Sequence, residues 1–327
     1  MKGRILLLVQ LAVSLGILVY FLSTIDFREA FRPIPNSGWI FFLATALLAN
    51  LDRVLMAFKW NLLVRVQGIR VPFREALRSY YFGTFWGIVL PSSVGGDAVR
   101  IYRISSLTGA PRSILSSVVV ERILGVLSVL TMVLMGAGLY LAYFRRGSLT
   151  LLVGVAALLA AGWFLFWVSL RVTLPARLQG WLAARTGRWG ERLQGLVSAH
   201  QIYRYHPGAV FRFLGLSVLE QGIPVACTYL VARGLGLPIP LLVFLMFTPL
   251  VMGLSRIPIS FDGFGIREGM YVYSLGQAGV PAADALVVGF LSHLVGNLSV
   301  LPGYLWSLSP APTANVIPAG PADLPKP

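Results

Sequence analysis

LPSSVGGDAVR at residues 90–100 has a counterpart in IPISFDGFGIR at residues 257–267. In both stretches a proline is followed five residues later by glycine and nine residues later by arginine. A short apolar stretch leads into each pattern, at residues 80–90 and 240–254. Stretches of roughly 10–14 residues are too short to cross the hydrocarbon core, and a broken backbone at membrane depth must lie inside the protein or beside a wet cavity. We therefore expect two re-entrant helical hairpins.

The similarity extends beyond the two breaks. Each is followed by a glycine-small-proline turn, at residues 109–111 and 279–281, and then by a long apolar segment. Polar residues lie within these apolar segments, namely Glu121 and Arg122 in the first copy and His293 in the second. The spacing predicts an internal repeat, and the loop charges predict that its two copies are inverted. Interrupted segments at matching positions in two halves are typical of transporters with a binding site near the membrane midplane.

The composition excludes most soluble and enzymatic classes. The chain has 327 residues, of which 57% are hydrophobic and only 12% charged, and its mean hydropathy is +0.77. One cysteine, Cys227, and three histidines supply neither a disulfide framework nor a structural zinc site. None of the three lysines follows a glycine-rich loop, so a Walker-type nucleotide site is excluded. We expect no cofactor, no bound metal and no enzymatic activity.

Apolar windows of the length of a membrane span predict an all-α polytopic membrane protein. About six full spans are expected beside the two re-entrant hairpins, at about residues 5–22, 38–58, 114–144, 149–170, 213–232 and 284–307. They form one membrane domain over residues 1–308, in which the first broken repeat covers 78–144 and the second covers 238–307. A tail rich in proline and alanine, at 309–327, is expected to be disordered.

The basic residues predict the orientation in the membrane. If the N-terminus is cytoplasmic, eighteen Lys and Arg residues lie on the inner side and five on the outer side, and the positive-inside rule then places both chain ends in the cytoplasm. Residues 171–212 hold seven arginines and are expected to form a basic cytoplasmic segment along the membrane surface. A net charge of +15 in so apolar a chain indicates contact with anionic lipid rather than with nucleic acid.

The residue types at the breaks are those of an anion site. The half-helix that begins after Gly95 and Gly96 presents free N–H groups and a positive dipole end, and glycine lets a ligand oxygen approach the backbone. Asp97 is a natural N-cap for that half-helix. Arg100, and Arg267 in the second copy, add positive charge, and a lipid phosphate is a suitable partner for an arginine at membrane depth.

Several charged residues have two interpretations. Glu121 and Arg122 are either a buried structural ion pair or part of the wall of a wet cavity, in which Glu121 titrates and Arg122 binds phosphate. Arg267 and Glu268 have the same alternatives, although neighbours on a helix point apart and do not pair with each other. Glu220 is a candidate proton relay.

The charged residues of the second span and the histidine of the last span are less specific. Snorkelling to the interface explains Lys59 and Arg53. Asp52 has no such explanation. His293 is more often a helix-packing group than a relay.

Three motifs, in order, resemble those of the flippase-like integral-membrane family: LPSSVGGDAVRIYR at 90–103, SVVVERIL at 117–124 and PISFDGFGIREG at 258–269. This family includes the transmembrane region of lysylphosphatidylglycerol synthases, and the resemblance spans roughly residues 5–308. It implies a polytopic bundle in a prokaryotic plasma membrane, with two re-entrant elements and movement of a lipid or lipid-linked headgroup between leaflets. The functional residues that it implies are Asp97, Arg100, Arg103, Glu121, Arg122, Arg267 and Glu268.

This sequence departs from the family pattern in two respects. Its second break differs from the Pro-Gly-Gly-Leu-Gly of many relatives, which leaves the identity of the lipid open. The soluble aminoacyl-transfer domain of the synthases does not fit in the 19 residues that follow the last predicted span, so aminoacylation of lipid is not expected of this chain.

We therefore predict a secondary flippase or scramblase for an anionic or phosphate-containing lipid. The predicted substrate-binding residues are Gly95, Gly96, Asp97, Arg100, Arg103, Arg122, Gly263 and Arg267, and the predicted proton-coupling or ion-coupling residues are Glu121, Glu220 and Glu268. Two alternatives stay open: a membrane enzyme that modifies lipid or polyprenyl-phosphate headgroups, and an accessory subunit of a separately encoded lipid synthase. The expected partners are membrane lipids, without nucleic acid, and a homo-oligomer is also open.

Overall fold

The computed structural model describes residues 35–89, 95–144, 149–171, 188–255 and 263–308, together with Gly16 and Ser23. Every element assigned within these ranges is a helix, which confirms the expected all-α fold. Four predicted features lie partly or wholly outside the described residues: the first span, most of the basic segment, the tail, and the break sequences themselves at 90–94 and 256–262.

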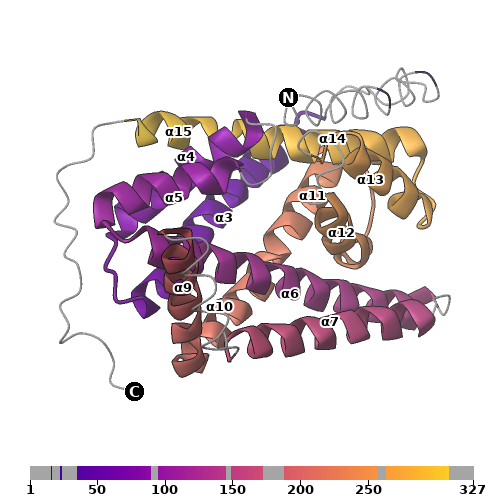
Figure 1. The fold of residues 1–327 in the computed structure, drawn as a ribbon. Coiled ribbons are helices and arrows are strands. Elements are labelled where there is room, and N and C mark those ends of the chain that lie inside the picture. The colour runs from indigo at the N-terminus through magenta and orange to yellow at the C-terminus, as the bar shows by residue number, and fades with distance from the viewer. Residues whose placement is uncertain are drawn as a thin grey trace.

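Figure 1 shows how the described helices are arranged. They are α3 (Gly38–Val66), α4 (Phe73–Val89), α5 (Gly95–Thr108), α6 (Pro111–Phe144), α7 (Leu149–Ser169), α9 (Arg188–Gln201), a 3-10 turn (Ile202–Tyr205), α10 (Pro207–Glu220), α11 (Gly222–Gly234), α12 (Leu241–Ser255), α13 (Ile266–Gly276), α14 (Ala282–Leu298) and α15 (Leu301–Ser307). Five stretches are long and apolar enough to cross a membrane: Gly38–Val66, Pro111–Tyr143, Leu152–Ser169, Pro207–Gly234 and Ala282–Ser307. They correspond to the five predicted spans within the described ranges, which confirms a multi-pass membrane protein.

The outer faces of these spans are apolar. On α3, Leu43, Leu47 and Leu51 recur every four residues and are 61%, 64% and 53% exposed. On α7, Phe164 and Leu165 are exposed to a similar degree. A contiguous apolar stripe of this kind is unfavourable in water and marks contact with another apolar phase, which for a polytopic bundle is lipid.

Helices α4 and α5 form the first hairpin, around residues 90–94. A Cβ added at Gly83 would lie 2.8 Å from the Gly96 carbonyl oxygen, and one added at Gly96 would overlap the Gly83 carbonyl oxygen and lie 3.2 Å from the Gly87 Cα. Small residues at a four-residue interval, here Gly83 and Gly87, let membrane helices approach closely. The contact at Gly96 is therefore helix packing, whereas the sequence led us to expect a ligand oxygen there.

Helices α12 and α13 form the second hairpin, around residues 256–262. Two glycines with left-handed backbone precede α13, Gly263 at φ +73° and Gly265 at φ +85°. Glu268 accepts a hydrogen bond from the Gly265 N–H at 2.6 Å, which satisfies a backbone donor at the start of α13. Because residues other than glycine rarely adopt such φ angles, this turn requires glycine at both positions. Each segment is thus divided into two helices that pack together, whereas the re-entrant course of the hairpins and the inverted repeat stay predictions.

Both hairpins pack against α6 (Figure 1). The first turn of α5 meets α6 at Arg122. Further along α6, a Cβ added at Gly253 of α12 would lie 2.9 Å from Val129 Cγ1, and one added at Gly136 would lie 2.8 Å from the Met246 carbonyl oxygen. Helix α12 therefore runs antiparallel to α6 and ends near Val129, which follows Arg122 by about 10 Å along the helix axis. The start of α5 and the end of α12 thus face the same middle stretch of α6.

Candidate functional site

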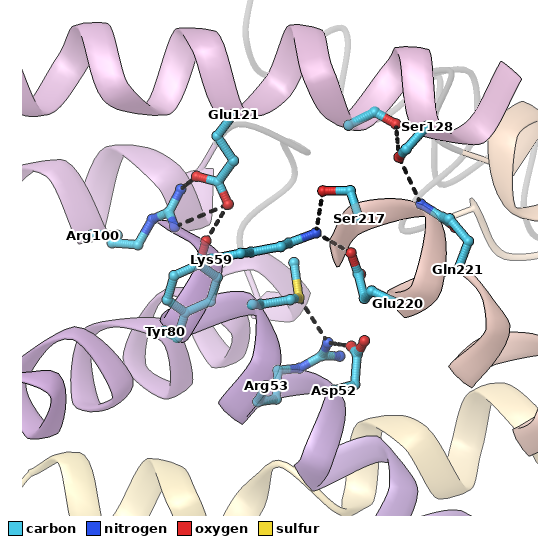
Figure 2. A network of polar contacts seen from close by, with 12 residues as sticks. Asp52, Arg53, Lys59, Tyr80, Arg100, Glu121, Ser128, Ser217, Glu220 and Gln221 are labelled. Atoms are coloured by element: carbon cyan, nitrogen blue, oxygen red, sulfur yellow. Dashed lines mark hydrogen bonds and ion pairs between the residues drawn. The ribbon is translucent and has the colours of Figure 1, made fainter. Parts of the chain in front are cut away.

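Arg100 lies at the centre of a buried charge network between α4, α5 and α6 (Figure 2). Its guanidinium donates to Glu121 Oε2 at 2.6 Å and to Asp97 Oδ1 at 3.2 Å. It also lies over the rings of Trp60 and Tyr80, at 4.7 and 4.3 Å from their centroids, and the Tyr80 hydroxyl donates to Glu121. The Arg100 side chain is only 4% exposed, so the carboxylates of the protein itself offset the cost of burying its charge.

Asp97 extends this network to Arg122 on α6. Arg122 Nε donates to Asp97 Oδ2 at 2.6 Å, and Arg122 Nη2 pairs with the same oxygen. Asp97 stands in the first turn of α5, where the helix dipole favours a negative charge. The Arg122 side chain is 55% exposed, compared with 11% for Asp97. Arg122 is therefore the most exposed charged group of the network.

The structure thus brings together four of the predicted site residues: Asp97, Arg100, Glu121 and Arg122. Glu121 and Arg122 are adjacent in the sequence, and each bonds a different residue of α5. Two guanidinium and two carboxylate groups balance in charge. Glu121 therefore forms its buried ion pair with Arg100, while the half-exposed Arg122 pairs with Asp97.

Arg103, which the family resemblance placed in the functional set, makes its contacts elsewhere. Its Nη1 donates to the Ser307 carbonyl oxygen at 3.1 Å, at the end of α15. Its guanidinium lies 5.2 Å from the centroid of the Phe82 ring, and Nη2 lies 3.9 Å from Glu75 Oε2. A cation at a helix C-terminus is stabilised by the helix dipole, so Arg103 ties α15 to the first hairpin.

The residues of the second break meet the last long span. Arg267 on α13 contacts His293 on α14, and His293 Nε2 lies 3.0 Å from Asn297 Nδ2. An arginine of the second hairpin thus meets a polar residue in the next long helix, as Arg100 meets Glu121 in the first copy.

Gly263 and Glu268 shape the turn that presents Arg267. A Cβ added at Gly263 would lie 3.1 Å from the Ser255 carbonyl oxygen and 3.2 Å from Arg267 Nη2. Glu268 is 4% exposed and bonds the backbone of Gly265. Both residues therefore hold the start of α13 in place.

Lys59 has a role that the sequence did not reveal. Its side chain is 4% exposed, and its Nζ donates to Ser217 Oγ at 3.0 Å and to the Glu220 carboxylate. The snorkelling expectation is wrong for Lys59, because α3 continues for about two turns beyond it and keeps it inside the bundle. The apolar residues that follow Lys59 in the sequence were the signal from which its burial inside the bundle could have been predicted. Arg53 pairs with the neighbouring Asp52 and is 20% exposed.

The exposed end of the network is the guanidinium of Arg122. A guanidinium offers parallel N–H donors that match the oxygens of a phosphate. In the part of the chain that the structure describes, no group of three or more His, Cys, Asp or Glu side chains could hold a metal ion.

The sequence of this chain matches the profile of a known protein family. The profile of the family described as lysylphosphatidylglycerol synthase TM region matches residues 7–303. The relatives include a UPF0104 membrane protein of Methanocaldococcus jannaschii, 27% identical over 125 residues, which are 38% of this chain and 36% of the relative. Another, from Pyrococcus horikoshii, is 23% identical over 156 residues, which are 47% of this chain and 46% of the relative. These two matches cover less than half of each relative, whereas the family profile covers both hairpins and the charge network. The chain therefore belongs to the lysylphosphatidylglycerol synthase transmembrane-region family.

Proposed function

We propose that this protein is a secondary lipid flippase or scramblase, which moves an anionic or phosphate-containing lipid or lipid-linked headgroup between leaflets without an enzymatic step. The observation that carries the proposal is the half-exposed guanidinium of Arg122, held by Asp97 at the first turn of α5. An ionisable group at membrane depth is a functional group by default, because its charge is costly in hydrocarbon. A lipid phosphate is a counter-ion that the bilayer itself supplies.

The network allows Arg122 to change partner. A phosphate that takes over the Arg122 guanidinium displaces one oxygen of Asp97. Asp97 then keeps Arg100, which bonds its other oxygen at 3.2 Å. No buried carboxylate is left alone during the exchange, which would otherwise cost several kcal/mol.

The arrangement of the hairpins supports a path for the headgroup. The start of α5 and the end of α12 face the same stretch of α6, and each hairpin places an arginine against a polar residue of the next long helix. In an inverted repeat, one copy rocks against the other around a fixed midplane site. The headgroup would pass between the hairpins while its acyl chains stay in the bilayer. We place the protein in a prokaryotic inner membrane with both chain ends in the cytoplasm.

Reconstitution into liposomes with a fluorescent phosphatidylglycerol tests this function. Phosphatidylglycerol is chosen because the family description names its lysylated form and because it carries one phosphate. Transport is followed by chemical quenching of the label in the outer leaflet. We expect Arg122→Gln to slow transport by about tenfold or more, since a hydrogen bond to a charged group contributes ~1.5–3 kcal/mol.

The matched control is Arg112→Gln, which removes an exposed arginine near the start of the same helix. This variant should transport at the wild-type rate. Equal rates for the Arg122 and Arg112 variants would show that the proposed headgroup site is wrong.

The family description also favours a second candidate, an accessory subunit that presents lipid to a separately encoded synthase. In that case the protein would co-purify with such an enzyme, and its removal would reduce modified lipid in cells without changing leaflet exchange in liposomes.

A further inference from the structure

A second group of ionisable side chains lies at the middle of two other spans. Asp52 is the central residue of the 29-residue helix α3, and Glu220 lies at the centre of the 28-residue span Pro207–Gly234. That span is interrupted here, since α10 ends at Glu220 and α11 begins at Gly222. Carboxyl groups near the midplane are costly and rare, and they mark ion or proton pathways.

The two carboxyl groups lie next to each other (Figure 2). Asp52 and Glu220 are 8% and 6% exposed, and the two carboxyl groups are close enough to interact electrostatically. Two ionised carboxylates at such close quarters repel each other, and a proton on one of them removes this repulsion. Asp52 Oδ1 is buried and receives no hydrogen bond from a donor group within the described ranges. A proton shared with Glu220 satisfies this oxygen.

Two cations complete this group of residues, which we name the midplane cluster: Asp52, Arg53, Lys59 and Glu220. Lys59 donates to Glu220, and Arg53 pairs with Asp52. The cluster is electrically neutral when both carboxyl groups are ionised and carries one positive charge when they share a proton. The ammonium and guanidinium groups already beside these oxygens repel a metal cation. A proton is therefore the cation that the cluster fits.

Other titratable groups face the cluster from the helices packed against α3. They are Cys227 on α11 and Tyr81 on α4. On α6, which also packs against α3, Glu121 is paired with Arg100. The contact from the end of α14 is not titratable, since the Asn50 amide donates to the Ser299 carbonyl oxygen at 3.1 Å. Thiol and phenol groups are much weaker acids than carboxyl groups, so Asp52 and Glu220 are the groups that exchange a proton.

The midplane cluster lies between α3, which packs against the first hairpin, and α10/α11, of which α11 packs against the second hairpin. Helix α3 packs against α4 of the first hairpin, where the Tyr81 hydroxyl donates to Asn50 Oδ1 at 2.7 Å. Helix α11 packs against α12 of the second hairpin, and Thr228 Oγ1 lies 3.2 Å from the Tyr271 hydroxyl oxygen on α13. A change of charge in the cluster therefore acts on the joint between α3 and α10/α11, and through it on the relative position of the hairpins.

We propose that Asp52 and Glu220 form a proton-binding site that couples the movement of lipid to a proton gradient. This inference rests on the transport function proposed above. In one state the proton bridges the two carboxyl groups. In the other state it has left to water on the opposite side of the membrane, and Arg53 and Lys59 neutralise the two carboxylates. The proton comes from water and returns to water, and no bond to the lipid is made or broken.

Transport in liposomes with and without an imposed pH gradient tests the coupling. We expect the gradient to change the wild-type rate at least about fivefold, and to have no effect on Asp52→Asn or Glu220→Gln. Asp284→Asn is the matched control, because it makes the same change at a carboxylate in the first turn of α14, outside the cluster. It should keep the full response, and Glu220→Asp should keep part of it. A wild-type rate that ignores the gradient, or variants that respond as the wild type does, would overturn the proposal.

Infrared spectroscopy of the purified protein tests the proton itself, whether or not lipid moves. The wild type and Asp284→Asn should show the absorption of a protonated carboxyl group, and this band should be lost in Asp52→Asn and in Glu220→Gln. An identical band in all four proteins would show that the shared proton is absent from this pair. If the wild type moves no lipid at all, the transport function fails while the band still decides whether the proton site exists.

Discussion

Asp97 Oδ2 accepts a hydrogen bond from Arg122 Nε at 2.6 Å, across the contact between α5 and α6. The Asp97 carboxylate is nearly buried and the Arg122 guanidinium is half exposed. One member of the pair therefore lies inside the bundle and the other at its surface. Because Asp97 also bonds Arg100, it acts as an internal competitor for the anion that Arg122 is proposed to bind.

Removing this competitor should strengthen binding of the headgroup. We expect Asp97→Asn to bind short-chain phosphatidylglycerol more tightly than the wild type, by roughly fivefold or more, because Arg122 no longer has an ionised partner. Binding is measured by the tryptophan fluorescence of purified protein in neutral detergent. Weaker binding by Asp97→Asn would mean that Asp97 is part of the receptor rather than its competitor.

Breaking the ion pair of Arg100 should destabilise the fold. Arg100→Gln leaves the Glu121 carboxylate buried without its cation, at a cost of about 3–5 kcal/mol. The double variant Arg100→Gln with Glu121→Gln should recover part of this loss, since it leaves no isolated charge. The free energy of unfolding in detergent, measured for both single variants and the double variant, gives the coupling; additive effects would argue against a direct pair.

Substitution of Gly96 should separate α4 from α5. A Cβ at Gly96 would overlap the Gly83 carbonyl oxygen, so Gly96→Ala should lower the stability by about 1–3 kcal/mol. Gly125→Ala is the control, because a Cβ at Gly125 of α6 meets nothing within 4 Å, and alanine is the better helix former by up to ~1 kcal/mol. Thermal unfolding midpoints should therefore move in opposite directions, and a neutral Gly96→Ala would contradict the packing described here.

Acid should weaken the contact between α7 and α9. His200 Nε2 lies 3.0 Å from Ser169 Oγ, and burial lowers the pKa of His200 below its ordinary value of 6.5. The folded state therefore favours the neutral ring, so its stabilising contribution is complete above pH 6.5 and is lost as the pH falls through the lowered pKa, by at most about 1.4 kcal/mol per pH unit. The thermal unfolding midpoint should fall less between pH 7.5 and 5 in His200→Gln than in the wild type. An equal fall in both proteins would show that His200 does not cause the loss of stability in acid.

The sequence was sufficient for features that depend on local chemistry. The spans follow from apolar windows long enough for the bilayer, and the interruption of both hairpin segments follows from proline and glycine, whose effect on the backbone does not need a distant partner. The family resemblance also named Asp97, Arg100, Glu121 and Arg122 as members of one functional set, although not which of them pair.

Only the tertiary structure decided which charges meet. Gly96 packs against Gly83, Arg103 caps α15, and Lys59 lies inside the bundle with Glu220. Helix periodicity says in which direction a side chain points, but the partner on that side depends on which helices pack there, and Lys59 and Glu220 are 161 residues apart. The energy of a buried charge is set by that partner and not by its neighbours along the chain.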